Sequence, residues 1–526
     1  MKDYQLPKLV KGKMSLIPIF VAFLSVVIVT LYLFVKRSYS YWERQGVPYK
    51  KPTFPLGNFT KSFLKQKSFA QDLQDLYNET SEPFYGVYST ITPALLIRDP
   101  RLIQNILVKD SQYFDEPGQH ASTDVDPMAD NLLLQHGEKW KRMRTKLSQA
   151  FTSGKLKGML PTIIDCGKSM EKYIEKFANT NESIELRQIF AHYATNVIVS
   201  VAFGLEIDCF ETDNEFSTNV VRVFFKPSFR AMVRSNFQTL LSPKLIKLFG
   251  VRFADKEVGD FLIETVRQNL EYREKNNVTR RDLFQLLMQI RNEGQVKEDD
   301  NWTTETKSGH KSLTIEDIAA QSLLFFLGGF DSSSSAMSFF LYELAKHPNI
   351  QQKVSDEIEE VIRRHDGELT YDAVSQMKYF SCCFTECLRL YPPFPGISRI
   401  CTTDYKIPGT SVVIEKGTSV IISSLGLHYD RSYYDEPEKF IPERHNESQR
   451  LQKSFIEMPN ITFGEGARNC IGRRLARLNS SVGLLLLLRK FRFELGDVHK
   501  NNENKISPTN FILALENGIN LKVVTR

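Results

Sequence analysis

The segment "TFGEGARNCIGRRLARLNSSVGLLLLL", residues 462–488, limits what this chain of 526 residues can fold into more than any other stretch. Gly464 and Gly466 allow a tight loop, because glycine adopts backbone conformations that other residues avoid. An apolar helix is predicted to begin just after Cys470. The thiol then lies at the positive end of the helix dipole, among N–H groups that the helix leaves free. We expect this position to lower the pKa of the thiol and to stabilise a thiolate.

A thiolate that accepts backbone hydrogen bonds is a good axial ligand for haem iron, although a cysteine taken by itself is usually structural. The loop matches the haem-binding pattern FxxGxRxCxG of the cytochrome P-450 family at Phe463, Gly464, Gly466, Arg468, Cys470 and Gly472. The chain resembles this family from residue 41 to its end. The resemblance implies a haem b cofactor whose iron is bound by Cys470, with Phe463 and Gly472 in the cofactor-binding loop. Ala467 stands where the family often has proline, which costs the loop some rigidity.

A second family motif is found in "TECLRLYPP", where Glu386 and Arg389 match the ExxR pattern. Residues three apart share one face of a helix, so this pair can form a buried ion pair. The resemblance implies a third partner from the later "PER" string, which is Arg444 here. His445 follows, where the family often has phenylalanine, and we expect this change to matter little to the chemistry.

Four residues are predicted to bind the haem propionates by resemblance. Trp140 and Arg144 match a WxxxR helix, and two further propionate positions fall on Arg399 and Arg468. A buried dianion needs such charged and hydrogen-bonding partners. Many relatives also have an arginine in the segment corresponding to "FDEPGQHAST", but this chain has none there. His120 is the hypothetical substitute.

The stretch "LLFFLGGFDSSSSAMSFFLYELAKHP" begins and ends like a helix but has a linker-like middle. Thr314 is predicted to cap a helix of about 32 residues, with Asp317 at the third position and an end before His347. Interior glycines cost a helix about 1 kcal/mol each relative to alanine. The alternatives are a loop between two shorter helices, or a notch for a neighbouring helix.

By resemblance, this is the central helix that crosses the haem. Gly328 and Gly329 are then expected to leave room for dioxygen. Asp331 and Ser332 are the candidate catalytic residues, which would hold water and pass protons during oxygen activation. The family usually has threonine at the position of Ser332.

Residues 15–35 contain no charge and are long enough, at about 30 Å, to span a bilayer as a helix. A cleaved signal peptide is the alternative, but its apolar region is usually shorter. Lysines and arginines flank both ends, so the charge bias hardly decides the orientation unless translation starts at Met14. The predicted organisation is a tail (1–14), a transmembrane anchor (15–35), a proline-rich hinge (36–58) and one catalytic domain (59–526).

Hydrophobic periodicity predicts a mainly α fold with minor β, which is the class of the cytochrome P-450 fold. Helices are expected near 138–205, 254–293, 314–346 and 349–365, and strands near 84–98, 397–422 and 511–524. Asn517-Gly518 predicts a hairpin turn within the last of these. The seven cysteines form no CxxC pair, which favours a reducing, cytosolic environment.

The predicted partners follow from the same resemblance. A basic face is expected to receive NADPH–cytochrome P-450 reductase, with cytochrome b5 as a further donor; its residues are Lys139, Lys141, Arg142, Lys146, Arg473, Arg474 and Arg477. The chain has no GxGxxG fingerprint, so NADPH is used by the partner flavoprotein. No helix-turn-helix or finger spacing is present, so nucleic acid is not an expected partner. Residues 222–249 are either surface helices or a second membrane contact near a pocket for a lipophilic substrate.

Three functions remain open at this point. The first is a monooxygenase in the endoplasmic reticulum membrane with its catalytic domain in the cytosol. The second is a haem-thiolate isomerase or dehydratase that acts on peroxides, and the third is a non-catalytic haem protein that binds ligands at a membrane. The strings "WERQGVPYKKPTFPLGN" and "FTSGKLK" are similar to those of the insect enzymes that oxidise xenobiotics. Nothing in the sequence names the substrate.

Overall fold

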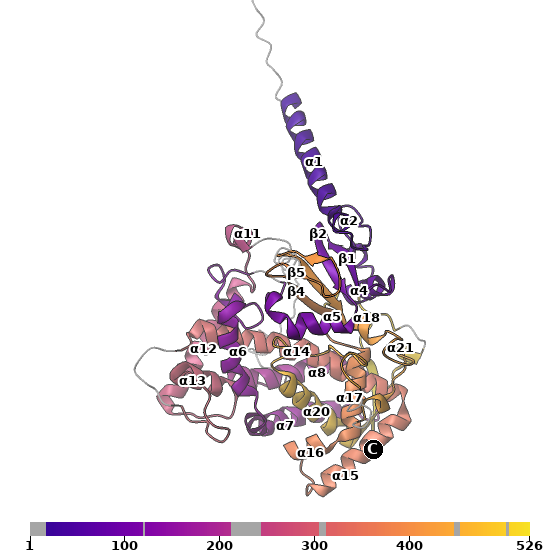
Figure 1. Ribbon diagram of the computed structural model, residues 1–526. Coiled ribbons are helices and arrows are strands. Elements are labelled where there is room, and N and C mark those ends of the chain that lie inside the picture. Colours follow the sequence, from indigo (N-terminus) through magenta and orange to yellow (C-terminus); the bar gives the residue numbers. More distant parts are fainter. Residues whose placement is uncertain (1–16, 119–120, 212–242, 305–311, 447–452, 501–503) are drawn as a thin grey trace, which may run out of the picture.

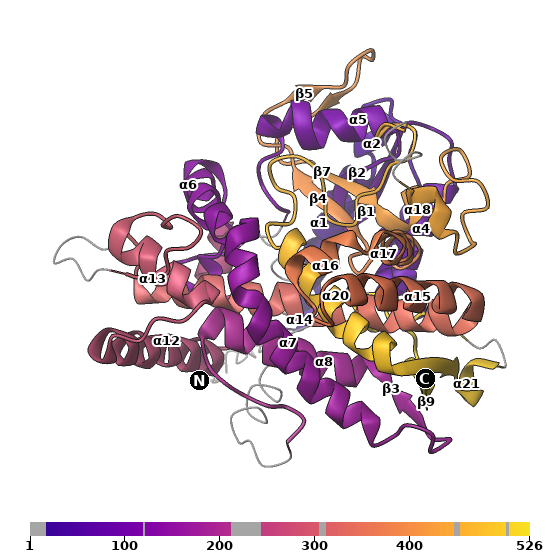
Figure 2. The same cartoon turned by 90° about the horizontal axis from the view of Figure 1, so that it is seen from below.

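One long helix, α14 (Ile315–Lys346), runs through the middle of the fold in both views of the computed structural model (Figures 1 and 2). Its predicted start is confirmed: the Thr314 hydroxyl accepts from the Asp317 N–H at 3.0 Å, and the Thr314 N–H donates to the Asp317 carboxylate at 2.8 Å. The helix is continuous through "GGFDSSSS". The alternative of a loop between two shorter helices is therefore wrong.

The structure describes residues 17–118, 121–211, 243–304, 312–446, 453–500 and 504–526. Helices dominate these ranges, as predicted. The helices besides α14 are α1 (Ile17–Tyr39), α2 (Tyr41–Arg44), α3 (Thr60–Phe63), α4 (Phe69–Asn78), α5 (Pro100–Gln104), α6 (Gly137–Ser148), α7 (Ser153–Glu175), α8 (Leu186–Ile198), α11 (Pro243–Leu248), α12 (Lys256–Asn276), α13 (Leu283–Glu293), α15 (Pro348–Arg364), α16 (Tyr371–Gln376), α17 (Lys378–Leu390), α18 (Ser424–His428), α20 (Arg473–Lys490) and α21 (Asp497–Lys500).

The core of the fold forms where α8, α12, α17 and α20 pack against α14. Their inward faces are apolar and fully or nearly fully buried, and they join one large hydrophobic cluster. The range 138–205, in which helices are predicted without their boundaries, contains α6, α7 and α8, with a short strand, β3 (Ser183–Glu185), before α8. Periodicity located the apolar faces but not these interruptions, because polar turns between helices leave the period nearly unchanged.

Three small sheets lie around the helical core. The first has the order β1-β2-β7-β4, in which β2 and β7 are parallel and the other pairs are antiparallel. The second has the order β3-β9-β8, and the third is the pair β5-β6. The strands are β1 (Phe84–Ser89), β2 (Thr92–Ile97), β4 (Gly396–Ile400), β5 (Tyr405–Lys406), β6 (Val413–Ile414), β7 (Ser419–Ser423), β8 (Phe491–Leu495) and β9 (Asn520–Thr525). This arrangement confirms the predicted fold class.

The predicted hairpin at Asn517-Gly518 is wrong. A turn exists there and Gly518 has a positive φ of 68°, but the two flanking runs do not pair with each other. Residues 506–515 bond among themselves and to Pro393, whereas β9 pairs with β3 and β8. Partners far away in the sequence therefore outcompete the local turn signal for these backbone groups.

The N-terminal helix α1 projects away from the rest of the fold (Figure 1), and its residues from Phe20 to Tyr39 are long and apolar enough to cross a membrane. The last turn of α1 is attached to the β1–β2 turn: the Ser38 hydroxyl donates to the Ile91 carbonyl, and the Tyr39 hydroxyl donates to the Thr90 carbonyl at 3.1 Å. The predicted anchor at 15–35 therefore continues as a helix past its last apolar residue.

The proline-rich segment that follows packs on the domain. Trp42 in α2 is 1% exposed, and its indole donates to the Val87 carbonyl at 3.0 Å. Further along, the Lys50 N–H donates to the Gly86 carbonyl at 2.9 Å. The segment thus continues the β1 edge, and these bonds give the end of α1 a fixed attachment to the domain.

Candidate active site

The cysteine loop is a tight turn held by its own backbone. The Cys470 N–H donates to the Phe463 carbonyl at 2.8 Å, and α20 begins three residues after the cysteine. Gly464 and Gly466 both have positive φ, as the predicted tight loop requires. A Cβ on Gly466 would lie 1.8 Å from the Leu107 carbonyl oxygen, so only glycine fits there.

The Cys470 thiol is exposed, although burial raises its pKa above the ordinary value. The thiol is therefore reachable from solvent and yet has protein atoms around most of it. A backbone hydrogen bond at Gly472 and the charges of Arg144 and Arg473 lower the pKa of the thiol, but burial exceeds them. The prediction of a lowered thiol pKa is therefore wrong for the chain by itself.

Arginine side chains from three distant parts of the chain meet beside this loop. Arg144 of α6 donates to the Asn469 carbonyl at 2.9 Å and to its side-chain oxygen at 2.7 Å. Arg468 lies over the Trp140 ring at 4.1 Å and donates to the Gln135 carbonyl at 2.9 Å. The structure thus brings together residues that the family motifs singled out separately.

Arg399 of β4 completes this group, and its guanidinium carries the clearest electrostatic signal. Burial and the charge of Arg468 lower the pKa of Arg399 to about 10. Burial also lowers the pKa of Arg144 and of Arg468. Guanidinium groups that are desolvated and repel one another are stabilised by an anion, so this cluster suits an anionic group beside the cysteine loop.

The candidate proton-relay residues lie on α14. Asp331 forms an ion pair with Arg187 of α8, with 2.6 Å between Nη2 and Oδ1. The Ser332 hydroxyl donates to the Gly328 carbonyl at 2.6 Å, one turn back in the same helix. Sequence reasoning missed Arg187, because no motif marks it and only the packing of α8 on α14 brings the two side chains together.

The two glycines of α14 face different surroundings. A Cβ on Gly328 would meet nothing within 4 Å, whereas a Cβ on Gly329 would lie 2.6 Å from Ile198 Cδ1 of α8. Gly328 therefore keeps its predicted role of leaving open space. For Gly329 that prediction is wrong, because the residue forms a notch for a neighbouring helix, which was the alternative.

The ExxR motif forms a buried ion pair, as predicted. The Glu386 carboxylate accepts from Arg389 through two bonds of 2.8 Å, and both side chains are fully buried. Arg444, in the short helix η6 (Pro442–His445), lies 3.3 Å from the same carboxylate. His445 is also buried and bonds Glu386 at 2.8 Å. Sequence reasoning missed this partner, because the family motif has no hydrogen-bonding side chain there.

This ion pair supports the cysteine loop through His428. Arg389 donates to the His428 carbonyl at 2.8 Å, and His428 Nε2 accepts from the Ile461 N–H at 3.1 Å. Burial lowers the pKa of His428 to about 3, so the ring is neutral and can accept this bond. The charge network on α17 thus holds the chain that leads into the loop.

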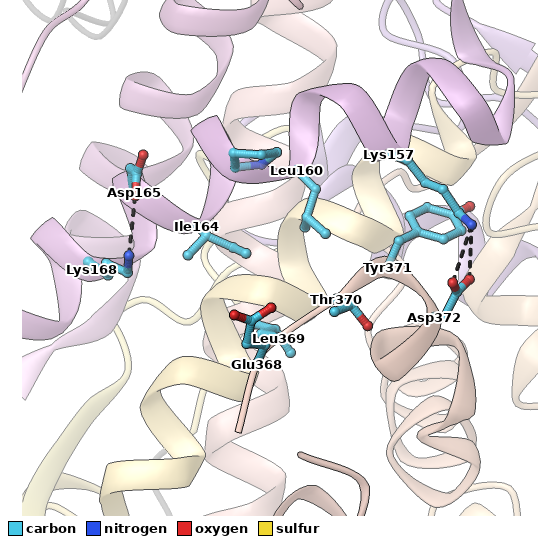
Figure 3. Close-up of a pocket in the computed structure, with 11 residues that line it drawn as sticks. Lys157, Leu160, Ile164, Asp165, Lys168, Glu368, Leu369, Thr370, Tyr371 and Asp372 are labelled. Atoms are coloured by element: carbon cyan, nitrogen blue, oxygen red, sulfur yellow. Dashed lines mark hydrogen bonds and ion pairs between the residues drawn. The ribbon is translucent and has the colours of Figure 1, made fainter. Parts of the chain in front are cut away.

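Two surface pockets lie apart from this site. One, of about 430 Å³, is formed between α7 and residues 368–372 and is lined by Lys157, Leu160, Pro161, Ile164, Asp165, Lys168, Glu368, Leu369, Thr370, Tyr371 and Asp372 (Figure 3). The other, of about 400 Å³, lies beside Tyr433 and Arg444. Neither contains a residue predicted to bind the cofactor, so these hollows do not mark the reaction centre.

Some sequence-based hypotheses fall on residues that the structure does not describe. His120, the proposed substitute for a missing arginine, lies outside the described residues, and so do residues 222–242 of the second membrane contact. In the described remainder of that contact, Leu248 and Phe249 are 74% and 66% exposed.

The predicted basic face is only partly available to a partner. Lys139 and Lys141 form ion pairs with Asp130 and Glu138. Lys146 and Arg477 bond serine or threonine hydroxyls. Of the seven cations predicted for this face, the exposed ones that make no ion pair with a described residue are Arg142, Arg473 and Arg474.

Replacing Gly329 by alanine should destabilise the fold, because overpacking a core costs about 1–3 kcal/mol and exceeds the gain of about 1 kcal/mol in helix propensity. Gly328→Ala should not destabilise it. Ile198→Val removes the Cδ1 atom, so adding it to Gly329→Ala should restore part of the lost stability. Denaturant unfolding measures all three, and equal stabilities of the two alanine variants would argue against the notch.

Glu386→Gln should lower the free energy of unfolding by about 3–5 kcal/mol, because it leaves Arg389 buried without its anion. Burial raises the pKa of Glu386, but Arg389 and His445 outweigh it and lower the pKa to about 2. The carboxylate therefore stabilises the wild type above the ordinary pKa of 4.5, and this contribution is lost as pH falls toward 2. The free energy of unfolding, measured at several acidic pH values, should fall more steeply with decreasing pH for the wild type than for Glu386→Gln. Parallel curves would refute this account.

Comparison with known proteins agrees with this geometry. Residues 48–523 match the family model described as "Cytochrome P450". "Probable cytochrome P450 6d5" of Drosophila melanogaster is 37% identical over 88% of this chain and 92% of that protein. "Cytochrome P450 6d1" of Musca domestica is 37% identical over 89% of this chain and 92% of that protein. "Cytochrome P450 6k1" of Blattella germanica is 36% identical over 89% of this chain and 90% of that protein.

These relatives are all insect proteins, and the number 6 follows "P450" in each of their names. This agrees with the insect branch that the hinge and "FTSGKLK" strings predicted. Family membership implies a haem cofactor, and the N-terminal apolar helix fits a membrane anchor. The chain therefore belongs to the cytochrome P450 family and is a P450 monooxygenase of the insect type.

Proposed function

We propose that the protein inserts one oxygen atom of O2 into a lipophilic small molecule at the endoplasmic reticulum membrane, with electrons from NADPH delivered by NADPH–cytochrome P450 reductase. The observation that carries the proposal is the cluster of three partly buried arginines, Arg144, Arg399 and Arg468, beside the Cys470 loop. A thiol that lies beside a cluster of cations suits a cofactor that carries both a metal ion and two negatively charged groups.

The residues present fit haem b. Cys470 would bind the iron, and a metal ion deprotonates a coordinating thiol whatever its pKa in the free chain. The propionates would be held by Arg144, Arg399 and Arg468 with Trp140 beside them, and Phe463 and Gly472 would flank the iron ligand. When bound, a haem with a thiolate ligand supplies the activation of dioxygen.

The chain's own contribution to this reaction is the control of protons. Asp331 and Ser332 are the proposed relay, and Gly328 leaves space beside them. Arg187 holds the Asp331 carboxylate in one orientation. Because the Ser332 hydroxyl donates its hydrogen bond to the Gly328 carbonyl, its oxygen is free to accept a hydrogen bond from water, as a relay requires.

The electron donor is proposed to dock on the exposed arginines Arg142, Arg473 and Arg474. Opposite charges steer a transient partner to its site, and an acidic flavoprotein surface would complement them. Cytochrome b5 is a further candidate donor for the same face. The internal ion pairs of Lys139 and Lys141 make these two lysines weaker contributors than the sequence predicted.

The proposed topology has a single uncleaved anchor and a cytosolic domain. Asn58, in one of the Asn-x-Ser/Thr triplets, uses its side chain inside the fold: its oxygen accepts from the Tyr88 N–H at 2.7 Å and its amide donates to the Lys51 carbonyl at 3.1 Å. The same amide donates to the Lys50 carbonyl at 3.4 Å, and a glycan would replace one of its two hydrogens, so it would cost one of these bonds. This supports the cytosolic side. The exposed Leu248 and Phe249 beside α11 support a second contact with the membrane.

The direct test of the cofactor assignment is Cys470→Ser. We expect it to abolish the thiolate-type absorption of the reduced carbon monoxide complex, because serine does not supply the sulfur ligand. Cys209→Ser, which changes another partly buried cysteine, is the matched control and should keep the spectrum. If Cys470→Ser kept the thiolate spectrum, another residue would be the ligand.

The relay is tested at Ser332. Threonine keeps the hydroxyl and stiffens χ1, so Ser332→Thr should raise the product formed per NADPH. Ser332→Ala removes the hydroxyl and should lower this ratio while more hydrogen peroxide is released. Identical coupling in all three proteins would exclude Ser332 as the relay.

Arg474→Glu should slow reduction by the reductase at low ionic strength, where surface charges are least screened, and leave ligand affinity nearly unchanged. Lys275→Glu, on the distant and exposed surface of α12, is the control for the change in net charge. Equal reduction rates for Arg474→Glu and Lys275→Glu would count against the docking site.

A further inference from the structure

The segment around Asp115 lies along β4 like an additional strand. The Ile400 N–H donates to the Glu116 carbonyl at 2.9 Å, and the Thr402 N–H donates to the Tyr113 carbonyl at 2.8 Å. A Cβ on Gly118 would lie 2.7 Å from the Ser398 hydroxyl. This is the segment in which the chain lacks the arginine that many relatives have. Its backbone nevertheless lies at the site, beside β4.

Asp115 connects two other elements of the site. Its Oδ1 accepts from Arg468 Nε at 3.1 Å, and its Oδ2 accepts from the N–H of Gly137, the first residue of α6, at 2.8 Å. The Arg468 and Asp115 side chains are 10% and 23% exposed. A single carboxylate therefore joins the cysteine loop to the start of the helix that carries Trp140 and Arg144.

The same carboxylate acts on the charge of the whole cluster. The Asp115 carboxylate lies 3.1 Å from Arg468 Nε, and its attraction raises the pKa of Arg399, against burial. Asp115 thus offsets one of the three guanidinium charges, and the two that remain match the charge of a dianion.

We propose that Asp115 is a positioning residue for the cofactor. It fixes the Nε edge of Arg468, so that the remaining guanidinium N–H groups can serve a propionate, and it sets the net charge beside the propionates. This inference rests on the proposed haem function.

The test compares Asp115→Asn with the wild type and with Asp110→Asn. Asp110 lies in the same stretch of chain and accepts from the Tyr405 hydroxyl at 2.7 Å. The control therefore loses a carboxylate that, among the described residues, makes no ion pair with an arginine. Haem release is followed as transfer to an excess of apomyoglobin. We expect release from Asp115→Asn to be about tenfold faster, because the lost orientation of Arg468 and of the start of α6 outweighs the stronger attraction between the propionates and a cluster that has lost a negative charge. Release from Asp110→Asn should be unchanged.

The haem reduction potential separates this role from a loss of packing. Removing a negative charge near the propionates favours the added electron, so the potential of Asp115→Asn should become more positive. Loosened packing would expose the haem to water and move the potential in the negative direction. Unchanged or slower release, or a potential that is unchanged or more negative, would overturn the inference. A wild type without the thiolate-type spectrum would instead refute the proposed haem function.

Discussion

Electrostatic repulsion among three arginines beside the cysteine loop is the constraint on which the site depends. Arg144, Arg399 and Arg468 come from α6, β4 and the loop, and each is partly desolvated. Burying like charges costs free energy that bonds to Asn469, Gln135 and Asp115 recover only in part. Binding an anionic cofactor would supply the remainder, so cofactor binding and the stability of this region are coupled.

A second charged network fixes the loop from behind. The buried Glu386 carboxylate bonds Arg389, Arg444 and His445. Arg389 in turn bonds the His428 carbonyl, and the His428 ring bonds the backbone that leads into the loop. In the first cluster two of the three arginines make no ion pair with a carboxylate of the described residues, whereas in the second every cationic partner bonds the Glu386 carboxylate. One is therefore suited to bind a ligand, and the other to hold a backbone.

Local signals in the sequence predicted the parts of the site that depend on local physics. The capping box at Thr314 and the glycines of the cysteine loop require only neighbouring residues, and both are confirmed. The turn at Gly518 also exists, but its hairpin does not, because β9 finds partners in β3 and β8. Partners that lie far apart in the sequence are decided by the packing of whole elements.

The same distinction explains the missed and mistaken residues. Arg187 meets Asp331, and Ile198 fills the notch at Gly329, only because α8 packs on α14. The pKa of Cys470 rises because burial, which no local pattern reports, exceeds the lowering by nearby N–H groups and arginines. Asp115 belongs to no local motif, and its partners Arg468 and Gly137 reach it only through the packing of the cysteine loop and α6.

The most direct test of the central claim is the source of the oxygen in the product. The purified full chain would be combined with NADPH–cytochrome P450 reductase, NADPH, isotopically labelled O2 and a lipophile that shifts the haem from low to high spin. The account predicts that each product molecule gains one labelled oxygen atom and that none forms without NADPH. A product without labelled oxygen, or one formed from an organic peroxide in the absence of NADPH and O2, would contradict it.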